Sequence, residues 1–434
     1  MLFRKVKNAQ GSKLFILGMK VYELRKTQTL NSTYLFGVKV RSKRPKGLID
    51  SAVREAAEQR IRDMAECFRE LPAAERHILC FDCLYDPLAE AIDAWTLFEY
   101  MQAQGIPCRY ALLTGNPLYA ELKAQNKLRD ILPVESEFDL LRRYPEEIAR
   151  SSRIFFSFPF TCSSILRDLP SIPFIFIEHG VNLMKAWCVR LYAPGGDSEC
   201  NYILTPSKLT KQLYESMNLM PGKMLAGGLP RWDKLPPHRH DKPQRNIFVF
   251  FTWRTSFVHD KSLLGTYVNR ITDFLVKLHE LIADNPQIRL SIGLHHAFLL
   301  HNPGFDFSRW KHVNIVPTNK ISSIIRETDL FITDYSSICF DLMYRDVPTI
   351  FYRFDNDLVY SNPMDNEAAV SAAEKDALLY NCCYEEPLAL RLAEQYIRNG
   401  FVLEDGLARV NEGIFWQRRD NCRTLLELSA NLQD

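Results

Sequence analysis

The feature that most constrains the fold is an alternation of short apolar runs with helix-patterned segments, which starts at residue 77 and continues through most of the chain. The runs are rich in Ile, Leu, Val and Phe on successive positions, a pattern typical of strands buried on both faces of a sheet. Their alternation with helices predicts doubly wound parallel sheets. The expected strands are residues 77–81, 108–113, 154–158, 174–177 and 202–204 in a first series and 247–253, 288–294, 313–316, 330–333 and 349–352 in a second.

A proline-rich polar stretch, residues 236–243, separates the two series and has the composition of a linker. The sequence therefore predicts an α/β protein with two Rossmann-like lobes and a cleft between them, the first over residues 75–236 and the second over residues 237–434. With 434 residues, 47% of them hydrophobic, the chain is long enough to bury two cores. Helices expected at residues 388–399 and 406–432 are predicted to pack back across the lobes.

A basic extension, residues 1–74, precedes the lobes. Its first 46 residues carry twelve Lys or Arg against one acid, Glu23, although the formal net charge of the whole chain is only +2. Two apolar repeats, residues 13–21 and 33–40, predict short strands, and a charged helix is expected at residues 49–70. Because no nucleic-acid-binding motif is present, an anionic membrane surface is the favoured partner. The alternative is a solvated basic tail.

No segment is apolar over the length of a membrane span, and no signal peptide is found. The expectation is a cytoplasmic protein, at most peripheral at the inner face of the cell membrane. The eleven cysteines include one Cys-x-x-Cys pair, Cys80 and Cys83, and are interpreted as reduced thiols, with a redox or metal site as the alternative.

The sequence also lacks a Gly-x-Gly-x-x-Gly loop and a P-loop, which argues against a dinucleotide enzyme and an NTPase. Asp355 and Asp357 match a three-residue metal motif that is common by chance. Neither a metal nor a cofactor is therefore predicted.

The first candidate for a ligand site lies in residues 328–352, whose pattern predicts strand, polar loop, helix and strand. Ser336 or Ser337 would cap the helix and leave its backbone N–H groups and positive dipole end facing a phosphate. In an open α/β sheet, ligands bind at the carboxyl ends of strands, where this loop would lie. An ordinary helix cap would give the same spacing. Asp334, itself anionic, is expected to orient a hydroxyl or Ser337 rather than to face phosphate.

Two histidines each follow a predicted strand. His179 lies between Glu178 and Gly180 and is a candidate general base, because the ordinary pKa of imidazole is close to neutrality. His295 could bind an anion when protonated. The alternatives are a hydrogen-bonded structural role for His179 and a metal site at His295 and His296.

Three further residues lie at strand ends or turns near the lobe boundary. Arg231 lies in a Gly/Pro turn that closes the first lobe, where it could contact a phosphate bidentately. The alternative is a packed interdomain loop in which Arg231 pairs with Asp233. Thr252 and Arg254 lie at the carboxyl end of the first strand of the second lobe and occupy the corresponding strand-end position.

Together these stretches resemble the CDP-glycerol glycerophosphotransferases, which polymerise wall teichoic acid and related capsule backbones. The family carries a Thr-Asp-Tyr-Ser-Ser block, then Phe-Asp, then a strand that leads to Tyr and Asp. The resemblance spans roughly residues 75–430 of the 434. Its motifs are matched in order by residues 178–180 with Lys185, residues 228–233, residues 252–254, His295, residues 333–355, and Asp405 with Gly406.

The resemblance implies a GT-B fold, no metal, and a CDP-activated polyol phosphate bound mainly by the second lobe. It also implies a membrane-linked glycan or polymer acceptor whose hydroxyl attacks the β-phosphorus of CDP-glycerol, with release of CMP. The residues it assigns are His179 and His295 as catalytic, Arg231, Thr252, Arg254, Asp334, Ser336, Ser337 and Asp341 as donor-binding, and Glu178 and Lys185 on the acceptor side.

The chain departs from the family pattern at Val181 and Asn182, which replace Thr-Pro where the acceptor or the transferred group should sit. CDP-ribitol therefore stays open as the donor, as does a GT-B glycosyltransferase of capsule or lipopolysaccharide assembly that uses a CMP- or UDP-sugar. Two rivals come from other classes. A sugar-nucleotide epimerase would consume donor without acceptor, and a binding protein would release no CMP.

Overall fold

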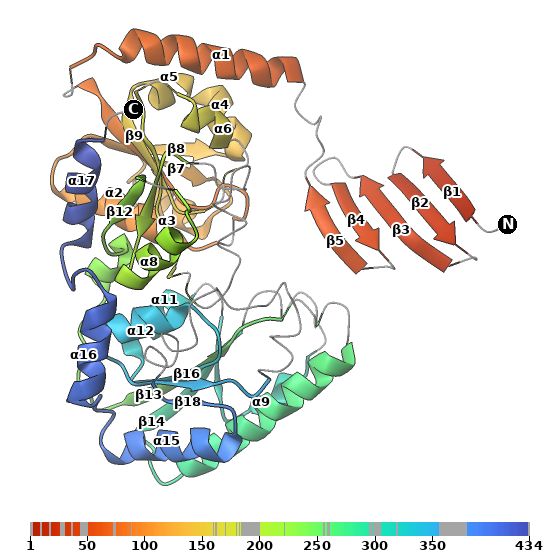
Figure 1. The fold of residues 1–434 in the computed structure, drawn as a ribbon, viewed down its shortest axis with the longest axis vertical. Helices are drawn as coiled ribbons and strands as arrows, with labels where there is room; N and C mark the ends of the chain where they lie inside the picture. Colours follow the sequence, from red (N-terminus) through yellow and green to blue (C-terminus); the bar gives the residue numbers. More distant parts are fainter. Residues whose placement is uncertain are drawn as a thin grey trace.

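The computed structural model contains three sheets, and two of them form the cores of lobes that lie one above the other in Figure 1. In the five N-terminal strands, only the backbone and its pairing are described. The structure describes residues 3–8, 11–16, 19–26, 31–35, 38–43, 51–72, 75–87, 89–158, 160, 163–169, 171–178, 180–181, 183, 200–220, 222–254, 257, 261–294, 298, 305–317, 320–355 and 380–432.

The first lobe is built on a seven-stranded parallel sheet with the strand order β12-β11-β10-β9-β6-β7-β8. The order reverses between β6 and β9, because the chain adds β7 and β8 on one side and then crosses to the other. Its strands are β6 (His77–Phe81), β7 (Cys108–Leu113), β8 (Ile131–Val134), β9 (Ser151–Phe156), β10 (Phe174–Phe176), β11 (Tyr202–Thr205) and β12 (Met224–Ala226). Its helices are α1 (Ser51–Phe68), α2 (Asp93–Ala103), α3 (Pro117–Ala124), α4 (Glu137–Arg143), α5 (Pro145–Ala149), α6 (Ser163–Arg167) and α8 (Lys208–Ser216), followed by the 3-10 turn η2 (Pro230–Lys234).

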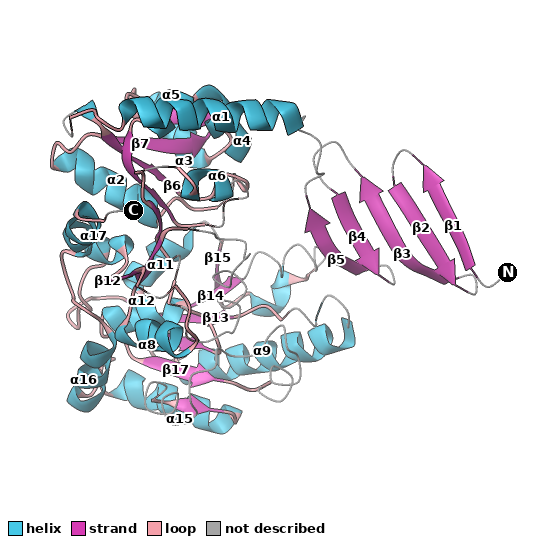
Figure 2. Cartoon of the chain, turned by 45° about the horizontal axis from the view of Figure 1, so that its top comes forward, coloured by secondary structure: helices cyan, strands magenta, loops and turns pink. Residues whose placement is uncertain are grey.

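The second lobe repeats this plan with a six-stranded parallel sheet of order β15-β14-β13-β16-β17-β18, which reverses between β13 and β16. The helices of both lobes flank their sheets (Figure 2). The strands of the second lobe are β13 (Arg245–Phe251), β14 (Ile288–Leu294), β15 (Asn314–Val316), β16 (Leu330–Thr333), β17 (Thr349–Tyr352) and β18 (Cys382–Cys383). Its helices are α9 (Lys261–Leu281), α11 (Ile321–Glu327), α12 (Ile338–Tyr344) and α15 (Glu386–Arg398), with the 3-10 turn η4 (Phe307–Trp310).

The two sheets confirm the predicted α/β class with two doubly wound lobes. β6, β7, β14, β16 and β17 begin and end at the predicted residues, and β6, β16 and β17 are buried at every position. Continuous burial explains why these strands appear in the sequence as unbroken apolar runs. The sequence pattern missed β8, β12 and β18, which are four, three and two residues long and offer too few positions for a periodicity to show.

The C-terminal helices cross from the second lobe to the first, as predicted. α16 (Asp405–Ile414) and α17 (Asn421–Ala430) run along one side of both lobes (Figure 1). Trp416 Nε1 donates a hydrogen bond to the Thr205 carbonyl at 2.8 Å, and Arg153 donates to the Leu426 carbonyl at 3.2 Å. The single helix expected over residues 406–432 is instead divided in two, with Asp420 in a left-handed conformation (φ 60°) just before α17.

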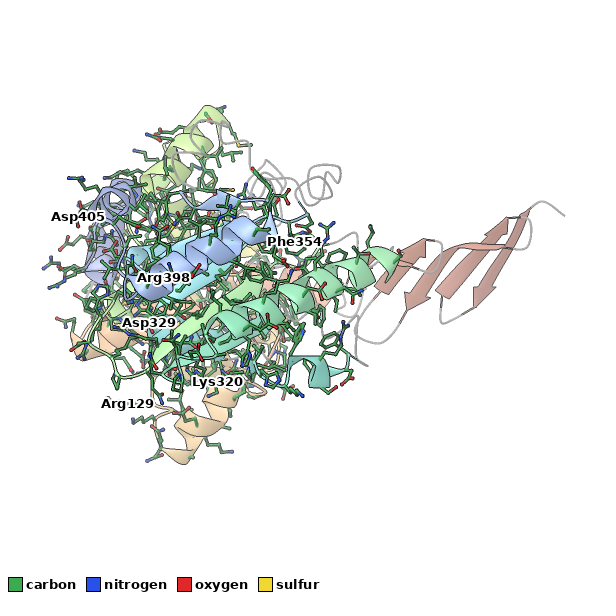
Figure 3. All side chains as sticks on the ribbon, turned by 90° about the horizontal axis from the view of Figure 1, so that it is seen from below. Arg129, Lys320, Asp329, Phe354, Arg398 and Asp405 are labelled. Carbon is green, nitrogen blue, oxygen red and sulfur yellow. The ribbon has the colours of Figure 1, made fainter. Side chains whose placement is uncertain are left out.

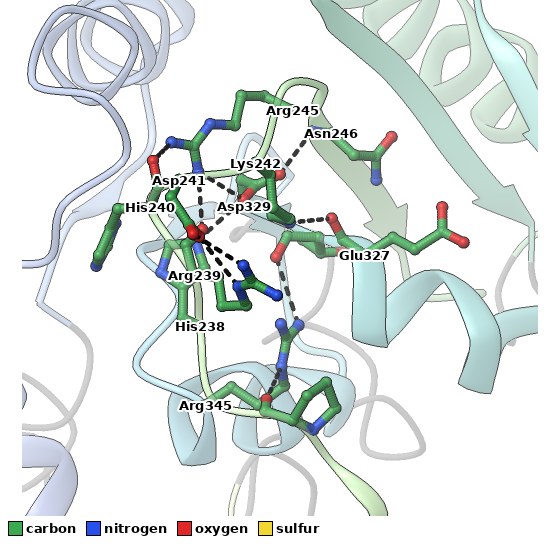
Figure 4. A network of polar contacts seen from close by, with 12 residues as sticks. His238, Arg239, His240, Asp241, Lys242, Arg245, Asn246, Glu327, Asp329 and Arg345 are labelled. Carbon is green, nitrogen blue, oxygen red and sulfur yellow. Dashed lines mark hydrogen bonds and ion pairs between the residues drawn. The ribbon is translucent and has the colours of Figure 1, made fainter.

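The linker between the lobes is held against the second lobe by the buried carboxylate of Asp329 (Figure 4). Asp329 accepts from Lys242 at 2.7 Å, and from His238 and Arg245 at 3.2 Å each. Although burial favours its protonated form, the hydrogen bonds from His238 and Lys242 outweigh it and lower the pKa of Asp329. Asp329 precedes β16, whereas Phe354 follows β17 (both are labelled in Figure 3), so this network lies at the amino end of the strands.

The N-terminal strands β1 (Phe3–Asn8), β2 (Gly11–Ile16), β3 (Met19–Lys26), β4 (Asn31–Leu35) and β5 (Val38–Lys43) form an antiparallel sheet in chain order. Each predicted repeat strand is divided between two paired strands, β2 with β3 and β4 with β5. Helix α1, expected in the extension, packs against α4 and α5 and buries Ile61 and Ala65 in the core of the first lobe. None of the described helices has both the length and the apolar character needed to cross a membrane.

Candidate active site

The candidate site lies where the strand order of the second sheet reverses, between β13 and β16. Thr252 and Arg254 follow β13, and residues 334–337 follow β16, so both sets come from the carboxyl ends of adjacent parallel strands. The crevice at such a reversal is where open α/β sheets bind ligands. The structure thus brings together the strand-end residues that the sequence predicted separately.

Arg254 is the centre of a buried polar cluster at this point. Its Nη2 donates to Asp334 at 2.7 Å, and its Nε and Nη2 donate to the two oxygens of Asp355 at 2.9 Å each. Asp334 also accepts the backbone N–H of Thr252 at 2.9 Å. Asp334 therefore joins the ends of β13 and β16, and its predicted role in orienting a hydroxyl or Ser337 stays a prediction.

The electrostatics of this cluster follow from its burial, since Arg254, Asp334 and Asp355 are at most 5% exposed. Burial raises the pKa of Asp355, against the opposing effect of Arg254, because a desolvated carboxylate is costly. Although burial alone would lower it, the pKa of Arg254 is raised, because two carboxylates face its guanidinium. The one guanidinium faces two carboxylates, so the three residues together carry a single excess negative charge.

Tyr335 and Arg353 are two residues of this cluster that the sequence analysis missed. The guanidinium carbons of Arg254 and Arg353 lie 4.9 Å and 4.5 Å from the centre of the Tyr335 ring. Cation–π contacts of this length hold a planar cation against an aromatic face. The aromatic residue directly after Asp334 was the sequence feature that could have indicated a cation–π contact here. Nothing local in the sequence indicates which cations would stack on it. Asp355 matches the family motif and a three-residue metal motif in the sequence, and in the structure it is an ion-pair partner of Arg254.

Thr252 offers a polar side chain to the site. Its backbone carbonyl accepts from Arg254 at 2.7 Å and from the Tyr267 hydroxyl at 3.1 Å. Its hydroxyl oxygen is buried and has no hydrogen-bond partner within the described ranges. Because a buried hydroxyl without a partner is unfavourable, the Thr252 side chain is suited to a polar ligand group.

Ser336 and Ser337 lead into helix α12 as predicted, but in different ways. Ser336 is buried, and its hydroxyl accepts the backbone N–H of Ile338 at 3.3 Å. Ser337 is the N-cap residue and makes no side-chain cap bond. One serine thus satisfies the helix end, while the other leaves its hydroxyl for a contact outside the helix.

That outside contact is with the first lobe. A Cβ built on Gly180 would lie 3.1 Å from Oγ of Ser337 and 3.4 Å from its Cβ, so the two backbones approach closely. Glu178, which follows β10, is fully buried and accepts a hydrogen bond from the Tyr214 hydroxyl. Glu178 is therefore anchored inside the first lobe, and Gly180 meets the start of α12 in the second.

The two predicted catalytic histidines, His179 and His295, and the predicted acceptor-side residue Lys185 lie outside the described residues. The structure describes Glu178 and Gly180 on either side of His179, and Leu294 before His295. Leu294 pairs with Phe251, which precedes Thr252. The roles of the three residues stay predictions.

Arg231 has partners that neither interpretation of the sequence named. Its guanidinium donates to Asp93 at 2.5 Å through Nη1, and to Asp341 at 3.0 Å and 3.1 Å through Nε and Nη2. Asp233, the partner expected in the alternative, instead accepts the backbone N–H groups of Asn421 and Cys422 at 2.8 Å each. Arg231 and Asp341 thus have the surroundings of packed residues at the lobe boundary, and direct donor contact by either one stays a prediction.

Metal ligands do not gather anywhere in the part of the chain that the structure describes, where no three His, Cys, Asp or Glu residues are placed to share an ion. Cys80 and Cys83 are both free and buried. Burial raises the pKa of both thiols, so they lack the low pKa of a reactive thiolate.

Comparison with known proteins places this site in a family. Residues 123–364 match the family model described as CDP-Glycerol:Poly(glycerophosphate) glycerophosphotransferase, and this match includes the carboxyl ends of both β13 and β16. The chain belongs to this family. Over 215 residues it is 23% identical to the Minor teichoic acid biosynthesis protein GgaB of Bacillus subtilis (strain 168). That alignment covers 45% of this chain and 23% of the relative, so the chain spans about a quarter of the length of this glycerophosphotransferase-family relative.

Solved structures support the fold of this glycerophosphotransferase-family member. The wall teichoic acid polymerase TagF matches with a TM-score of 0.55 at 16% identity, covering 88% of this chain and 95% of the TagF chain. A TagF variant soaked with CDPG matches with a TM-score of 0.53 at 16% identity, covering 88% and 94%. These matches confirm the predicted GT-B-like arrangement of two lobes.

Proposed function

We propose that the protein transfers glycerol phosphate, or a related polyol phosphate, from a CDP-activated donor to a hydroxyl of a membrane-linked glycan or polymer. The reaction releases CMP and belongs to the biosynthesis of a cell-surface polymer of the teichoic acid type. The observation that carries this proposal is the meeting of family-motif residues from both lobes, Gly180 from the first and Ser337 from the second, beside the strand reversal of the second sheet. The family match and the relation to GgaB and to a polymerase soaked with CDPG support the same chemistry.

In the proposed reaction the acceptor oxygen forms a bond to the β-phosphorus of the donor, and the bond from that phosphorus to the bridging oxygen breaks. CMP leaves with the bonding electron pair. His179 takes the proton of the acceptor hydroxyl, and His295 contacts the donor phosphates, whose negative charge shifts towards CMP. Phosphoryl transfer of this kind depends mainly on positioning and on charge stabilisation.

The second lobe supplies the proposed donor site. The hydroxyls of Thr252, Ser336 and Ser337 and the backbone N–H groups at the start of α12 would contact the diphosphate. The Arg254 cluster would keep the ends of β13 and β16 at a fixed spacing beneath it, since all its members are buried. The proposed reaction uses neither a metal ion nor a cofactor.

A donor screen with the purified protein tests the function. CDP-glycerol, CDP-ribitol, CMP-sugars and UDP-sugars would each be supplied with a polyol phosphate oligomer as acceptor, and free CMP, UMP and UDP would be measured. We expect CMP release that depends on both CDP-polyol and acceptor. Release of UDP from a UDP-sugar would favour a glycosyltransferase instead. Donor turnover without acceptor would favour an epimerase, and nucleotide binding without any release would indicate a binding protein.

The proposal includes peripheral attachment to the inner face of the cell membrane through residues 1–46. Those residues carry twelve Lys or Arg against a single acid, and strands β1–β5 arrange most of them in one small sheet. Basic groups near an anionic bilayer are attracted to it by about 1 kcal/mol each. A membrane-linked acceptor would then be brought to the lobes by the same surface.

A further inference from the structure

The 3-10 turn η2 lies at the boundary of the lobes, and its successive side chains contact different elements. Arg231 bonds to Asp93, the first residue of α2, and to Asp341 in α12. Trp232 donates its indole N–H to the same Asp341 at 2.6 Å and stacks on Tyr344 at 4.6 Å between ring centres. A single turn therefore joins a helix of the first lobe to a helix of the second.

The ion pairs of this turn are buried, which distinguishes them from surface contacts. The side chains of Arg231, Asp93 and Asp341 are 14%, 3% and 5% exposed. Two carboxylates share one guanidinium, so one negative charge in excess is buried, and burial raises the pKa of Asp93 to about 6 against the effect of Arg231. Buried ion pairs are frequently no more stabilising than apolar replacements, so stability alone does not account for this arrangement.

The turn is connected directly to the candidate site through α12. Asp341 lies four residues after Ser337, one helical turn along the same short helix, and Ser337 is the residue that meets Gly180 of the first lobe. The Arg231 guanidinium donates two parallel hydrogen bonds to the Asp341 carboxylate of α12, at 3.0 Å and 3.1 Å. This bidentate geometry fixes both the distance and the orientation of the two groups. A shift of α12 relative to α2 would therefore break the ion pairs and open the contact between Ser337 and Gly180 together.

We propose that Asp93, Arg231 and Asp341 are positioning residues that set the distance between the lobes at the reacting groups. The proposal rests on the proposed function for its catalytic consequence, but its geometric consequence does not depend on that function. In this proposal the three residues act through α12 and α2 rather than on the reacting atoms. Loss of the ion pair between Arg231 and Asp93 would release α2 from the turn, which is expected to misplace Ser337 against the first lobe, and a displacement near 1 Å can lower a rate by about a hundredfold.

The first test is Asp93→Asn, which removes one charge and keeps the shape of the side chain. We expect kcat/KM to fall by about a hundredfold, while the affinity for CMP measured by calorimetry and the thermal midpoint are both retained. The matched control is Lys234→Ala, which breaks the exposed ion pair with Glu99 between the same turn and the same helix. The control should keep full activity. A fall in activity that only parallels a fall in thermal midpoint would make the triad merely structural and overturn the proposal.

The second test reports on geometry without needing activity. In a Gly180→Cys and Ser337→Cys protein, the two Cβ atoms would lie 3.4 Å apart, close to the spacing that a disulfide needs. Oxidation should join residues 180 and 337 rapidly, which mass spectrometry of the linked peptides would detect. Adding Asp93→Asn should slow this cross-linking by about tenfold or more, because the lobes no longer hold one spacing. Equal cross-linking rates with and without Asp93→Asn would overturn the proposal, whereas failure of the donor screen alone would overturn only the proposed function.

Discussion

Gly180 and Ser337 approach so closely across the lobe boundary that a methyl group on Gly180 would lie 3.1 Å from the Ser337 hydroxyl oxygen. Residue 180 has no side chain, and this permits the close approach of the first lobe to the start of α12. Gly180→Ala should therefore push Ser337 away by a few tenths of an ångström. We expect kcat/KM to fall roughly tenfold, less than the hundredfold that a displacement near 1 Å can cost.

A glycine elsewhere provides the control for that substitution. Gly413 lies in α16 with nothing within 4 Å of its added Cβ, so Gly413→Ala should keep activity and stabilise the helix by up to about 1 kcal/mol. Unaltered turnover in a folded Gly180→Ala protein would show that the contact with Ser337 does not matter for the reaction.

Ser336 and Ser337 are expected to bind phosphate in both the donor and CMP. Replacing both by Ala should weaken binding of CDP-glycerol and CMP to a similar extent, by on the order of 3 kcal/mol for two hydrogen bonds to a charged group. Calorimetry with CMP measures this directly. Ser336→Ala alone also removes the bond to the Ile338 N–H, so its thermal midpoint should fall more than that of Ser337→Ala. If a folded double variant binds CMP normally, the two serines act only as helix caps.

His179 and His295 are predicted to have different roles, which kinetics can separate. His179→Ala should lower turnover by roughly a hundredfold to ten-thousandfold, the usual contribution of a general base, with donor affinity retained. His295→Ala should weaken donor binding and also slow the chemical step, because negative charge grows on the leaving phosphate. The acidic limb of the pH profile of turnover should report a histidine ionisation and disappear in the His179 variant. A fully active, donor-binding His179→Ala protein would remove this residue from the mechanism.

Arg254 should be required for stability as well as for the site. Arg254→Met leaves the buried carboxylates of Asp334 and Asp355 without their shared cation, which we expect to lower the free energy of unfolding by about 3–5 kcal/mol. Denaturant unfolding at pH 7 measures this loss. Arg239→Met is the matched control, because its ion pair with Asp241 is exposed and should contribute nothing measurable.

The stability of the same Arg254→Met protein is expected to depend on pH. Burial raises the pKa of Asp355 and Arg254 opposes this rise, so without the guanidinium the folded state binds a proton at Asp355 more tightly. The stability that this group contributes is then present at low pH and lost as pH rises. The deficit of the variant relative to the unaltered protein should therefore shrink as pH is lowered from 7 towards 5. A deficit independent of pH would mean that the carboxylates are not the cause.

Residues 1–46 are predicted to bind anionic lipid. Deleting them should abolish sedimentation with vesicles that contain phosphatidylglycerol, because several basic residues at about 1 kcal/mol each suffice for peripheral binding. Activity on a soluble acceptor oligomer should be retained. Neutral vesicles provide the control, since the intact protein should bind them weakly. Equal binding of the intact and truncated proteins to anionic vesicles would show that residues 1–46 are not the membrane-binding segment.

The amino-acid sequence alone predicts the α/β class, the division into two lobes and the strand ends at which Thr252, Arg254, Asp334 and the two serines lie. It could do so because strands buried on both faces require unbroken apolar runs, and because loops at their carboxyl ends carry the polar residues. It also carried the family motifs that residues 123–364 match. It missed the break at residues 415–420, where no glycine or proline interrupts the helical pattern.

The pairing of charges, in contrast, depends on how distant parts of the chain pack together. Asp93 and Asp341 are 138 and 110 residues away from Arg231 in the sequence, and Asp355 is 101 residues away from Arg254. A guanidinium fork fits a carboxylate as well as a phosphate, so the residue type alone cannot tell a lobe-positioning arginine from a donor ligand. The choice depends on which helices pack against the turn, and that packing is a property of the assembled lobes rather than of any local stretch of the chain.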